Sequence, residues 1–297
     1  MKRAIGALSV GLALIAAAVP ASAGPPIGVL QSRLDEKQAA ASSVYLAWVQ
    51  NSITNRKHFN VFFKSRGSSA KRVNPKSTSA EMGGVDGGTL IYQQINGKTS
   101  DIAVYSLGTD HALATPAGIN TAAWEWHPSI SGPRILFGRG NPRNHHTVRR
   151  VLLFDTRTHR TRTLAHTGAG IFSVVPGQVN GHYVVWWKCT PKRCDVFRRD
   201  LGSGTTIHVP NPGGKLQYNP SVTRSGVVFY ARSGLGCGGG VTIRRFEAGA
   251  VATLVTFPKR YDTTRTFAYR DGDKTVLLYD RQQCKSLATD VYKIALP

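Results

Sequence analysis

The stretch from Trp124 to Leu164 contains four short segments that are typical of β-strands. They are rich in Val, Ile, Leu and Phe, and turn residues such as Gly, Pro and Asn or the polar run 155–160 separate them. β-Branched and aromatic side chains suit a pleated, half-buried surface, whereas Gly, Pro and Asn permit sharp turns. The segments are Glu125–His127, Arg134–Phe137, Val151–Phe154 and Thr161–Leu164. The stretch therefore predicts a unit of four strands.

The third strand of this unit has counterparts along the chain. They end at Ser65, Ser106, Asp155, Asp200, Glu247 and Ala295, with spacings of 41, 49, 45, 47 and 48 residues. Repeats of about 40 to 50 residues with four strands each are typical of propeller blades. We therefore predict an all-β fold, a β-propeller of about six four-stranded blades. The blades are expected at residues 35–75, 81–115, 124–165, 174–209, 218–257 and 262–297.

Closure of this ring depends on a strand from the start of the chain. The sixth blade lacks a fourth strand, because the sequence stops at Pro297 directly after a third one. Since an open edge on a twisted sheet is a liability, we expect the run Ile27–Leu34 to supply the missing strand. Asp35–Ser42 has a poor composition for a first strand of blade one. A helix over Leu30–Ala41 is the competing interpretation.

Two predicted blades share a motif of an aromatic residue, a variable residue and Pro, followed by a turn with Gly and an apolar strand. The matches are Trp126-His127-Pro128 with Gly132 and Ile135-Leu136-Phe137, then Leu152-Leu153-Phe154-Asp155, and Tyr218-Asn219-Pro220 with Gly226 and Val227-Val228-Phe229. This pattern resembles the TolB-type β-propeller repeat. The resemblance covers nearly all of the chain after its N-terminal segment and implies a propeller without the α/β domain that precedes it in TolB. It carries over no partner or role.

The N-terminus has the three parts of a secretory signal peptide. Lys2 and Arg3 are followed by the apolar run Ala4–Val19 and by Ala21-Ser22-Ala23, which is an A-x-A cleavage site. The apolar run is short for a membrane anchor, which needs about 20 apolar residues. We therefore predict a signal peptide at 1–23, a propeller domain at 24–297, no membrane span, and a secreted or periplasmic location after cleavage near Ala23.

The sequence contains four cysteines, which an exported protein is expected to oxidise to disulfides. Four cysteines allow three connectivities, and the sequence alone does not select one. Cys189 and Cys194 lie between two strand-like runs, where a hairpin brings them together, so the favoured pairs are Cys189–Cys194 and Cys237–Cys284. The C-x4-C spacing also occurs in metal sites, but no second pair with zinc-finger spacing accompanies it.

Positive charge is the extreme feature of the composition. The 38 Lys and Arg residues outnumber 16 Asp and Glu, and losing Lys2 and Arg3 with the signal peptide lowers the net charge from +22 to +20. The loops between second and third strands share one face of a propeller, and in blades three and four they are basic. An arginine fork holds phosphate or carboxylate with two hydrogen bonds. The expected anion-binding residues are Arg139, Arg143, Arg149, Arg150, Lys192 and Arg193.

Catalytic signatures are scarce. The sequence has no G-x-S-x-G elbow, no sialidase-type turn and no H-E-x-x-H motif. Glu125, between two tryptophans on a first strand, is a candidate for the central channel. The adjacent His145 and His146 have no acidic or cysteine ligand nearby in sequence, so a solvated loop is favoured over a metal site. We assign no catalytic residue, metal or cofactor.

These observations favour an exported, non-enzymatic binding or scaffold protein, whose partner is a protein or an anionic polymer of the cell envelope. The alternative is a polysaccharide-active enzyme, a lyase or hydrolase, that uses the central channel. Nucleic acid is disfavoured as a partner because export removes the usual target. We expect a monomer.

Overall fold

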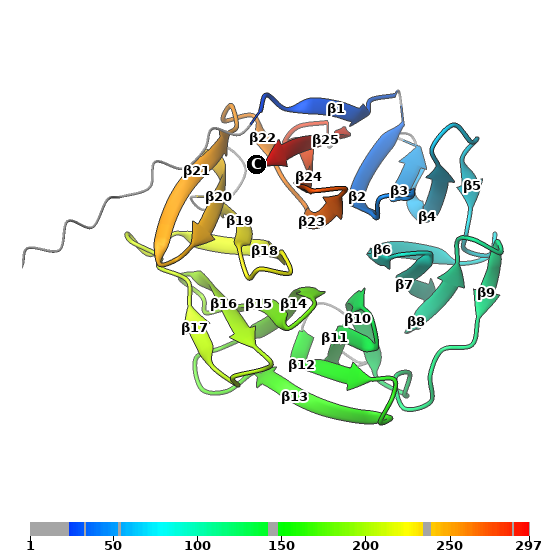
Figure 1. Cartoon of the computed structure of the whole chain (residues 1–297), viewed down its shortest axis with the longest axis horizontal. Helices are drawn as coiled ribbons and strands as arrows, with labels where there is room; N and C mark the ends of the chain where they lie inside the picture. Colours follow the sequence, from blue (N-terminus) through cyan, green and yellow to red (C-terminus); the bar gives the residue numbers. More distant parts are fainter. Residues whose placement is uncertain are drawn as a thin grey trace, which may run out of the picture.

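The computed structural model describes residues 24–32, 34–52, 55–141, 148–233, 239–286 and 288–296, with residues 52 and 55–57 described by their backbone only. These residues form strands β1 to β25 and contain no helix. The strands make six sheets that follow one another around a ring, with one edge of each sheet at the centre (Figure 1). The predicted all-β, six-bladed propeller is confirmed.

The blades follow the chain in order, and each first strand is innermost. Blade one contains β2 (Asp35–Ala41), β3 (Tyr45–Ser52), β4 (Asn55–Ser65) and β5 (Lys71–Arg72). Blade two contains β6 (Ser79–Asp86), β7 (Thr89–Asn96), β8 (Thr99–Ser106) and β9 (His111–Leu113). Blade three contains β10 (Trp124–Ser131), β11 (Arg134–Gly140), β12 (Val148–Asp155) and β13 (Arg160–His166).

The second half of the ring repeats the same order. Blade four contains β14 (Ser173–Asn180), β15 (Tyr183–Cys189), β16 (Cys194–Asp200) and β17 (Thr206–His208). Blade five contains β18 (Leu216–Val222), β19 (Val228–Ser233), β20 (Val241–Glu247) and β21 (Ala250–Thr256). Blade six contains β22 (Tyr261–Asp262), β23 (Thr266–Asp271), β24 (Lys274–Gln283), β25 (Thr289–Leu296) and, from the N-terminal side, β1 (Ile27–Leu30).

The N-terminal strand closes the ring as predicted. β1 pairs antiparallel with β25, and Ile27 lies opposite Lys293 in this ladder. Figure 1 shows the blue N-terminal strand beside the red C-terminal one in the same blade. The competing helix over Leu30–Ala41 is wrong, because residues 35–41 pair with β3 as the inner strand of blade one. Packing between neighbouring sheets buries Ala39, Ala40 and Ala41 and overrides the weak strand propensity of the segment.

The inner strands share a β-bulge near their middle. The pairing register shifts within β2, β6, β10, β14 and β18. At the bulge, Gln38, His127 and Asn219 have positive φ angles of 53°, 45° and 50°. A Cβ at Gly83 would lie 2.1 Å from the carbonyl oxygen of Ile91, so this blade requires glycine there. A bulge bends its strand and redirects side chains, and the aromatic-x-Pro motif marks this position in blades three and five.

The predicted hairpin disulfide is confirmed. Cys189 and Cys194 are directly opposite each other in the β15–β16 ladder and are covalently joined. Cys284 is also disulfide-bonded, while its predicted partner Cys237 lies outside the described residues. The predicted signal peptide at 1–23 lies outside them as well. No helix in the described part of the chain has the length and apolarity to cross a bilayer.

Candidate functional site

The centre of the ring is nearly filled by side chains from the inner strands. The cavity on the axis has a volume of about 30 Å³, which is room for about one water molecule. Its lining includes Gln38, His127, Gln178, Asn219, Arg265 and Thr266. The inner strands therefore surround a small cavity with a mixed polar and apolar lining, which also includes Pro176, Trp187 and Pro220.

Gln178 closes one part of the channel. Its amide extends from β14 in blade four to blade six, where Nε2 donates to the carbonyl of Ala268 at 2.7 Å and Oε1 accepts from the N–H of Ala268 at 3.1 Å. The same oxygen accepts from the N–H of Val222 in blade five at 3.2 Å. One buried side chain thus connects three blades through backbone groups that need partners.

Arg265 closes another part of the channel from blade six. Its guanidinium donates to the carbonyl oxygens of Met82, at 2.6 Å through Nη1, and of Gly83, both in blade two. Burial lowers the pKa of Arg265 to about 10, while the charges of Asp280 and Glu81 oppose this shift. The side chain remains a cation at neutral pH and joins blades that are not adjacent in the ring.

His127 lies on the same axis. Burial lowers the pKa of its imidazole, and the charge of Arg265 adds to the effect while Glu81 opposes it. The ring is therefore neutral at pH 7, since an ordinary histidine pKa is about 6.5. The N–H of His127 donates to Oε1 of Gln93 at 3.3 Å, which holds the bulge of β10 against blade two.

A larger cavity opens at one end of the axis. It lies on the face that carries the turns between the first and second strands of the blades, which we term the turn face. This cavity, the funnel, has a volume of about 310 Å³. Gln178 lines both the funnel and the axial cavity, so the plugged channel forms the base of the funnel. Its lining includes Ser42, Ser43, Asp86, Arg224, Tyr269 and Arg270.

The rim of the funnel carries charges of both signs. Oδ1 of Asp86 lies 4.0 Å from Nη2 of Arg224, and the two side chains are 31% and 66% exposed. An ion pair this exposed contributes little to stability, so both groups can exchange partners with a ligand. Oδ2 of Asp86 also accepts from the N–H of Gly132 at 2.5 Å, which fixes the carboxylate at the boundary between blades two and three.

A second cavity adjoins the funnel at the junction between blades one and six. This cavity, the seam groove, has a volume of about 270 Å³ and shares Ala41, Ser42, Ser43 and Tyr269 with the funnel. It extends outward along the site where β1 closes the ring. Together the two cavities form a continuous depression on the turn face.

The predicted channel residue Glu125 has no exposed surface. It is a residue of β10 and lies opposite Arg139 of β11. Its Oε1 accepts from Nε of Arg139 and from Oγ1 of Thr121, both at 2.9 Å. Burial raises the pKa of this carboxyl, although the hydrogen bond to Thr121 and the charge of Arg139 oppose the shift. Contact with a ligand requires a rearrangement of this pair.

The predicted anion-binding residues occupy different surroundings. The guanidinium of Arg139 donates hydrogen bonds to the carboxylate of Glu125 and, at 2.6 Å, to the carbonyl oxygen of Ile119. This side chain is therefore engaged within the protein. Arg149 and Arg150 are exposed on β12, and Arg143 lies outside the described residues. Anion binding on this loop face stays a prediction.

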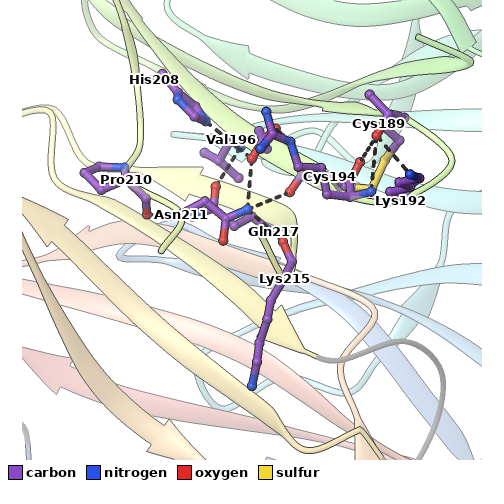
Figure 2. Close-up of polar contacts among 12 residues, drawn as sticks. Cys189, Lys192, Cys194, Val196, His208, Pro210, Asn211, Lys215 and Gln217 are labelled. Carbon is purple, nitrogen blue, oxygen red and sulfur yellow. Dashed lines mark hydrogen bonds and ion pairs between the residues drawn. A yellow bond between two sulfur atoms is a disulfide. The ribbon is translucent and has the colours of Figure 1, made fainter. Parts of the chain in front are cut away.

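In blade four the hairpin with the disulfide carries the remaining two predicted residues (Figure 2). Nε of Arg193 lies 3.0 Å from Oδ2 of Asp195, whose other oxygen lies 3.4 Å from Nε2 of His208. Nδ2 of Asn211 donates to that oxygen at 2.8 Å. Lys192 is exposed at the tip. Asp195 therefore connects the hairpin to the connection between blades four and five.

Sequence reasoning missed the residues of the funnel and the seam groove. What these residues share is their position, because Asp86, Arg224 and Arg270 all lie within two residues of the end of an inner strand. Only the closed ring brings these positions together. Within the described residues, no group of three or more His, Cys, Asp or Glu side chains could hold a metal ion.

No protein-family model and no curated protein matches this sequence. Among solved structures, the chain is similar to the β-propeller domain of the trilobed protease from Pyrococcus furiosus, which is described as having an open velcro topology. The two share 9% identity with a TM-score of 0.53, and the match covers 90% of this chain and 94% of that one. It is also similar to a prolyl endopeptidase (12% identity, TM-score 0.51, 84% of this chain and 40% of that one). A third match is the acylaminoacyl peptidase of Pyrococcus horikoshii (12% identity, TM-score 0.50, 88% and 51%).

These matches support the TolB resemblance only at the level of a six-bladed propeller, since the similar structures are propeller domains of peptidases. The present chain spans 40% of the prolyl endopeptidase and 51% of the acylaminoacyl peptidase.

The comparison contradicts the prediction of a non-enzymatic binding or scaffold protein, because the similar solved structures come from peptidases.

Proposed function

We propose that this chain acts in peptide hydrolysis, as the propeller that receives the peptide substrate of a peptidase. The proposal rests mainly on the funnel, a cavity of about 310 Å³ that is lined by hydrogen-bonding and charged groups. The likeness to peptidase propellers supports the same class of substrate. Small-molecule and cofactor pockets in proteins have volumes of about 300–1,000 Å³.

The chemistry of the funnel fits a peptide. A peptide in extended form presents N–H donors and carbonyl acceptors on both sides, and its free ends carry opposite charges. The funnel offers the hydroxyl of Ser43, the carboxylate of Asp86 and the guanidinium groups of Arg224 and Arg270. Charge-assisted hydrogen bonds to such groups are the stronger ones.

In this proposal, the hydrogen bonds of Gln178 at the base of the funnel limit how far the peptide enters. Gln178 satisfies backbone groups of blades five and six at the base of the funnel, so a peptide that enters from the turn face stops there. One end of the peptide occupies the funnel, and the rest leaves along the surface. Passage through the ring would first break the hydrogen bonds of Gln178 and Arg265.

The proposal includes an extracytoplasmic location. The Cys189–Cys194 bond supports it, because structural disulfides persist mainly in oxidising compartments. A signal peptide at residues 1–23 is part of the same proposal.

The first test measures peptide binding by the full chain, produced by export into an oxidising compartment. Isothermal titration calorimetry with synthetic hexapeptides is expected to show saturable binding. Ser43→Trp fills the mouth of the funnel from an exposed turn and is expected to weaken binding about tenfold. The matched control is Ser203→Trp, an exposed serine in the turn after β16. Equal affinities for both variants, or no binding by the wild type, would contradict the proposal.

The second test addresses hydrolysis. Producing cells that lack the chain are expected to cleave the same hexapeptides more slowly in their exported fraction. Wild type and Ser203→Trp should restore the rate, whereas Ser43→Trp should not. An unchanged rate on deletion would show that the chain takes no part in hydrolysis.

A further inference from the structure

The seam groove differs from the funnel in its charge. Its flanks carry three cations and one carboxylate: Lys64, Arg66, Lys293 and Asp271. In the described part of the chain, none of the three cations has a carboxylate oxygen within 4.0 Å. Arg66 is exposed, and the two lysines are half-buried. Nζ of Lys64 lies over the ring of Trp48, 5.7 Å from its centre. Cations that have no carboxylate partner and line a cavity attract an anionic ligand.

The base of the groove is apolar. Val29 from β1, Leu46 from β3 and Leu278 from β24 line it together with Tyr45 and Tyr269. Burial raises the pKa of Tyr269 to about 12, with Asp271 adding to the shift and Arg66 opposing it. The phenol therefore stays protonated at neutral pH and lies close to both charged groups. An apolar base beneath cations suits a ligand that carries an apolar group next to an acidic one.

We propose that the seam groove selects peptides that carry an acidic side chain beside an apolar one. This inference rests on the proposed function, since the end of the same peptide occupies the funnel. The acidic side chain lies among Arg66, Lys64 and Lys293, and the apolar neighbour packs on the partly exposed Val29 and Leu46. Ser43 and Tyr269, which line both cavities, contact the peptide where it passes between them.

The apolar base separates this ligand from other anions. A net charge of +22 for the full chain attracts polyanions over the whole surface, and that attraction is lost with salt. Heparin or polyphosphate has no apolar group to bury, so it gains nothing from Val29 and Leu46. A peptide gains from both features, because burial of apolar surface contributes independently of salt.

The experiment compares two hexapeptides that differ at one position. One carries glutamate beside leucine, and the other carries glutamine beside leucine. Calorimetry with the wild-type chain is expected to show about fivefold tighter binding of the glutamate peptide at ~50 mM salt, and a smaller preference at ~500 mM. Arg66→Gln and Lys293→Gln are expected to abolish the preference, because the glutamate peptide then binds no more tightly than the glutamine peptide.

A matched control removes the same charge elsewhere. Arg157 is an exposed arginine in the turn after β12 of blade three, and Arg157→Gln is expected to retain the full preference. Equal binding of both peptides by the wild type overturns this inference and leaves the proposed function standing. If neither peptide binds, both proposals fail. If Arg157→Gln lowers the preference as much as Arg66→Gln does, the preference comes from the overall charge of the chain. That result would also overturn the inference.

Discussion

Replacement of Asp280 by alanine is expected to loosen the junction between blades six and one. Asp280 is in β24 and is 1% exposed. Its Oδ1 accepts from Oγ1 of Thr263 at 2.9 Å, from the N–H of Thr264 at 2.5 Å and from the N–H of Arg265 at 3.2 Å. Its Oδ2 accepts from the N–H of Gln38 in β2 at 3.0 Å. One carboxylate therefore holds the inner strand of blade one against blade six.

The cost follows from the donors that lose their acceptor. Alanine leaves three backbone N–H groups without a partner, and each such group costs about 1–3 kcal/mol if it stays buried. Partial relaxation lowers the sum, so we expect about 4 kcal/mol for Asp280→Ala. Asparagine keeps one oxygen for blade six but cannot accept at both positions. We therefore expect about 2 kcal/mol for Asp280→Asn, with the loss concentrated at Gln38.

Urea unfolding with linear extrapolation measures the free energy of unfolding, and hydrogen exchange at Gln38 reports the local opening. The matched control is Asp155→Ala, because Asp155 accepts from the N–H groups of Arg157 and Thr158 at 2.9 and 3.2 Å in an exposed turn. It is expected to cost about 1 kcal/mol. If Asp280→Ala costs no more than Asp155→Ala, or if exchange at Gln38 does not change, the reasoning is refuted.

Arg139→Met leaves the buried carboxylate of Glu125 without its cation and is expected to cost about 3 kcal/mol at pH 7. The cost should be smaller at pH 4, because burial raises the pKa of Glu125. The folded protein therefore binds this proton more tightly than the unfolded chain and loses stability as the pH rises. Equal urea midpoints for wild type and variant would contradict this prediction. Joint replacement of Cys189 and Cys194 by alanine opens a loop with a sequence separation of 5 and should cost about 2 kcal/mol relative to the oxidised wild type; an unchanged free energy of urea unfolding would refute this. Leu30→Ala removes an 8% exposed side chain from the closing strand and should cost about 3 kcal/mol, with faster proteolysis near the N-terminus; unchanged protease resistance would argue against β1 as the closing strand.

Much of the ring could be predicted because a propeller is built from local hairpins. Each blade begins within two residues of its predicted start, since strand and turn residues alternate with a fixed period. The hairpin disulfide was predictable for the same reason, because the cysteines flank one tight turn.

Blade one shows where local sequence is insufficient. The inner strand β2 has the sequence DEKQAAA, which has weak strand propensity, and the helical alternative fitted it at least as well. Its conformation depends on neighbours far along the chain. Pairing with β3, the hydrogen bond from Gln38 to Asp280 and packing against β6 impose the strand.

The sequence by itself determined the period, the number of blades, the closing strand and one disulfide. Each depends on residues close in the chain, except the closing strand, which follows from the unpaired edge of the last sheet. Only the tertiary structure decided that Gln178 and Arg265 plug the axis and that Arg139 is held by Glu125. It also placed Arg66 of blade one beside Tyr269 of blade six in the seam groove. These contacts join residues from separate blades, and closure of the ring creates them.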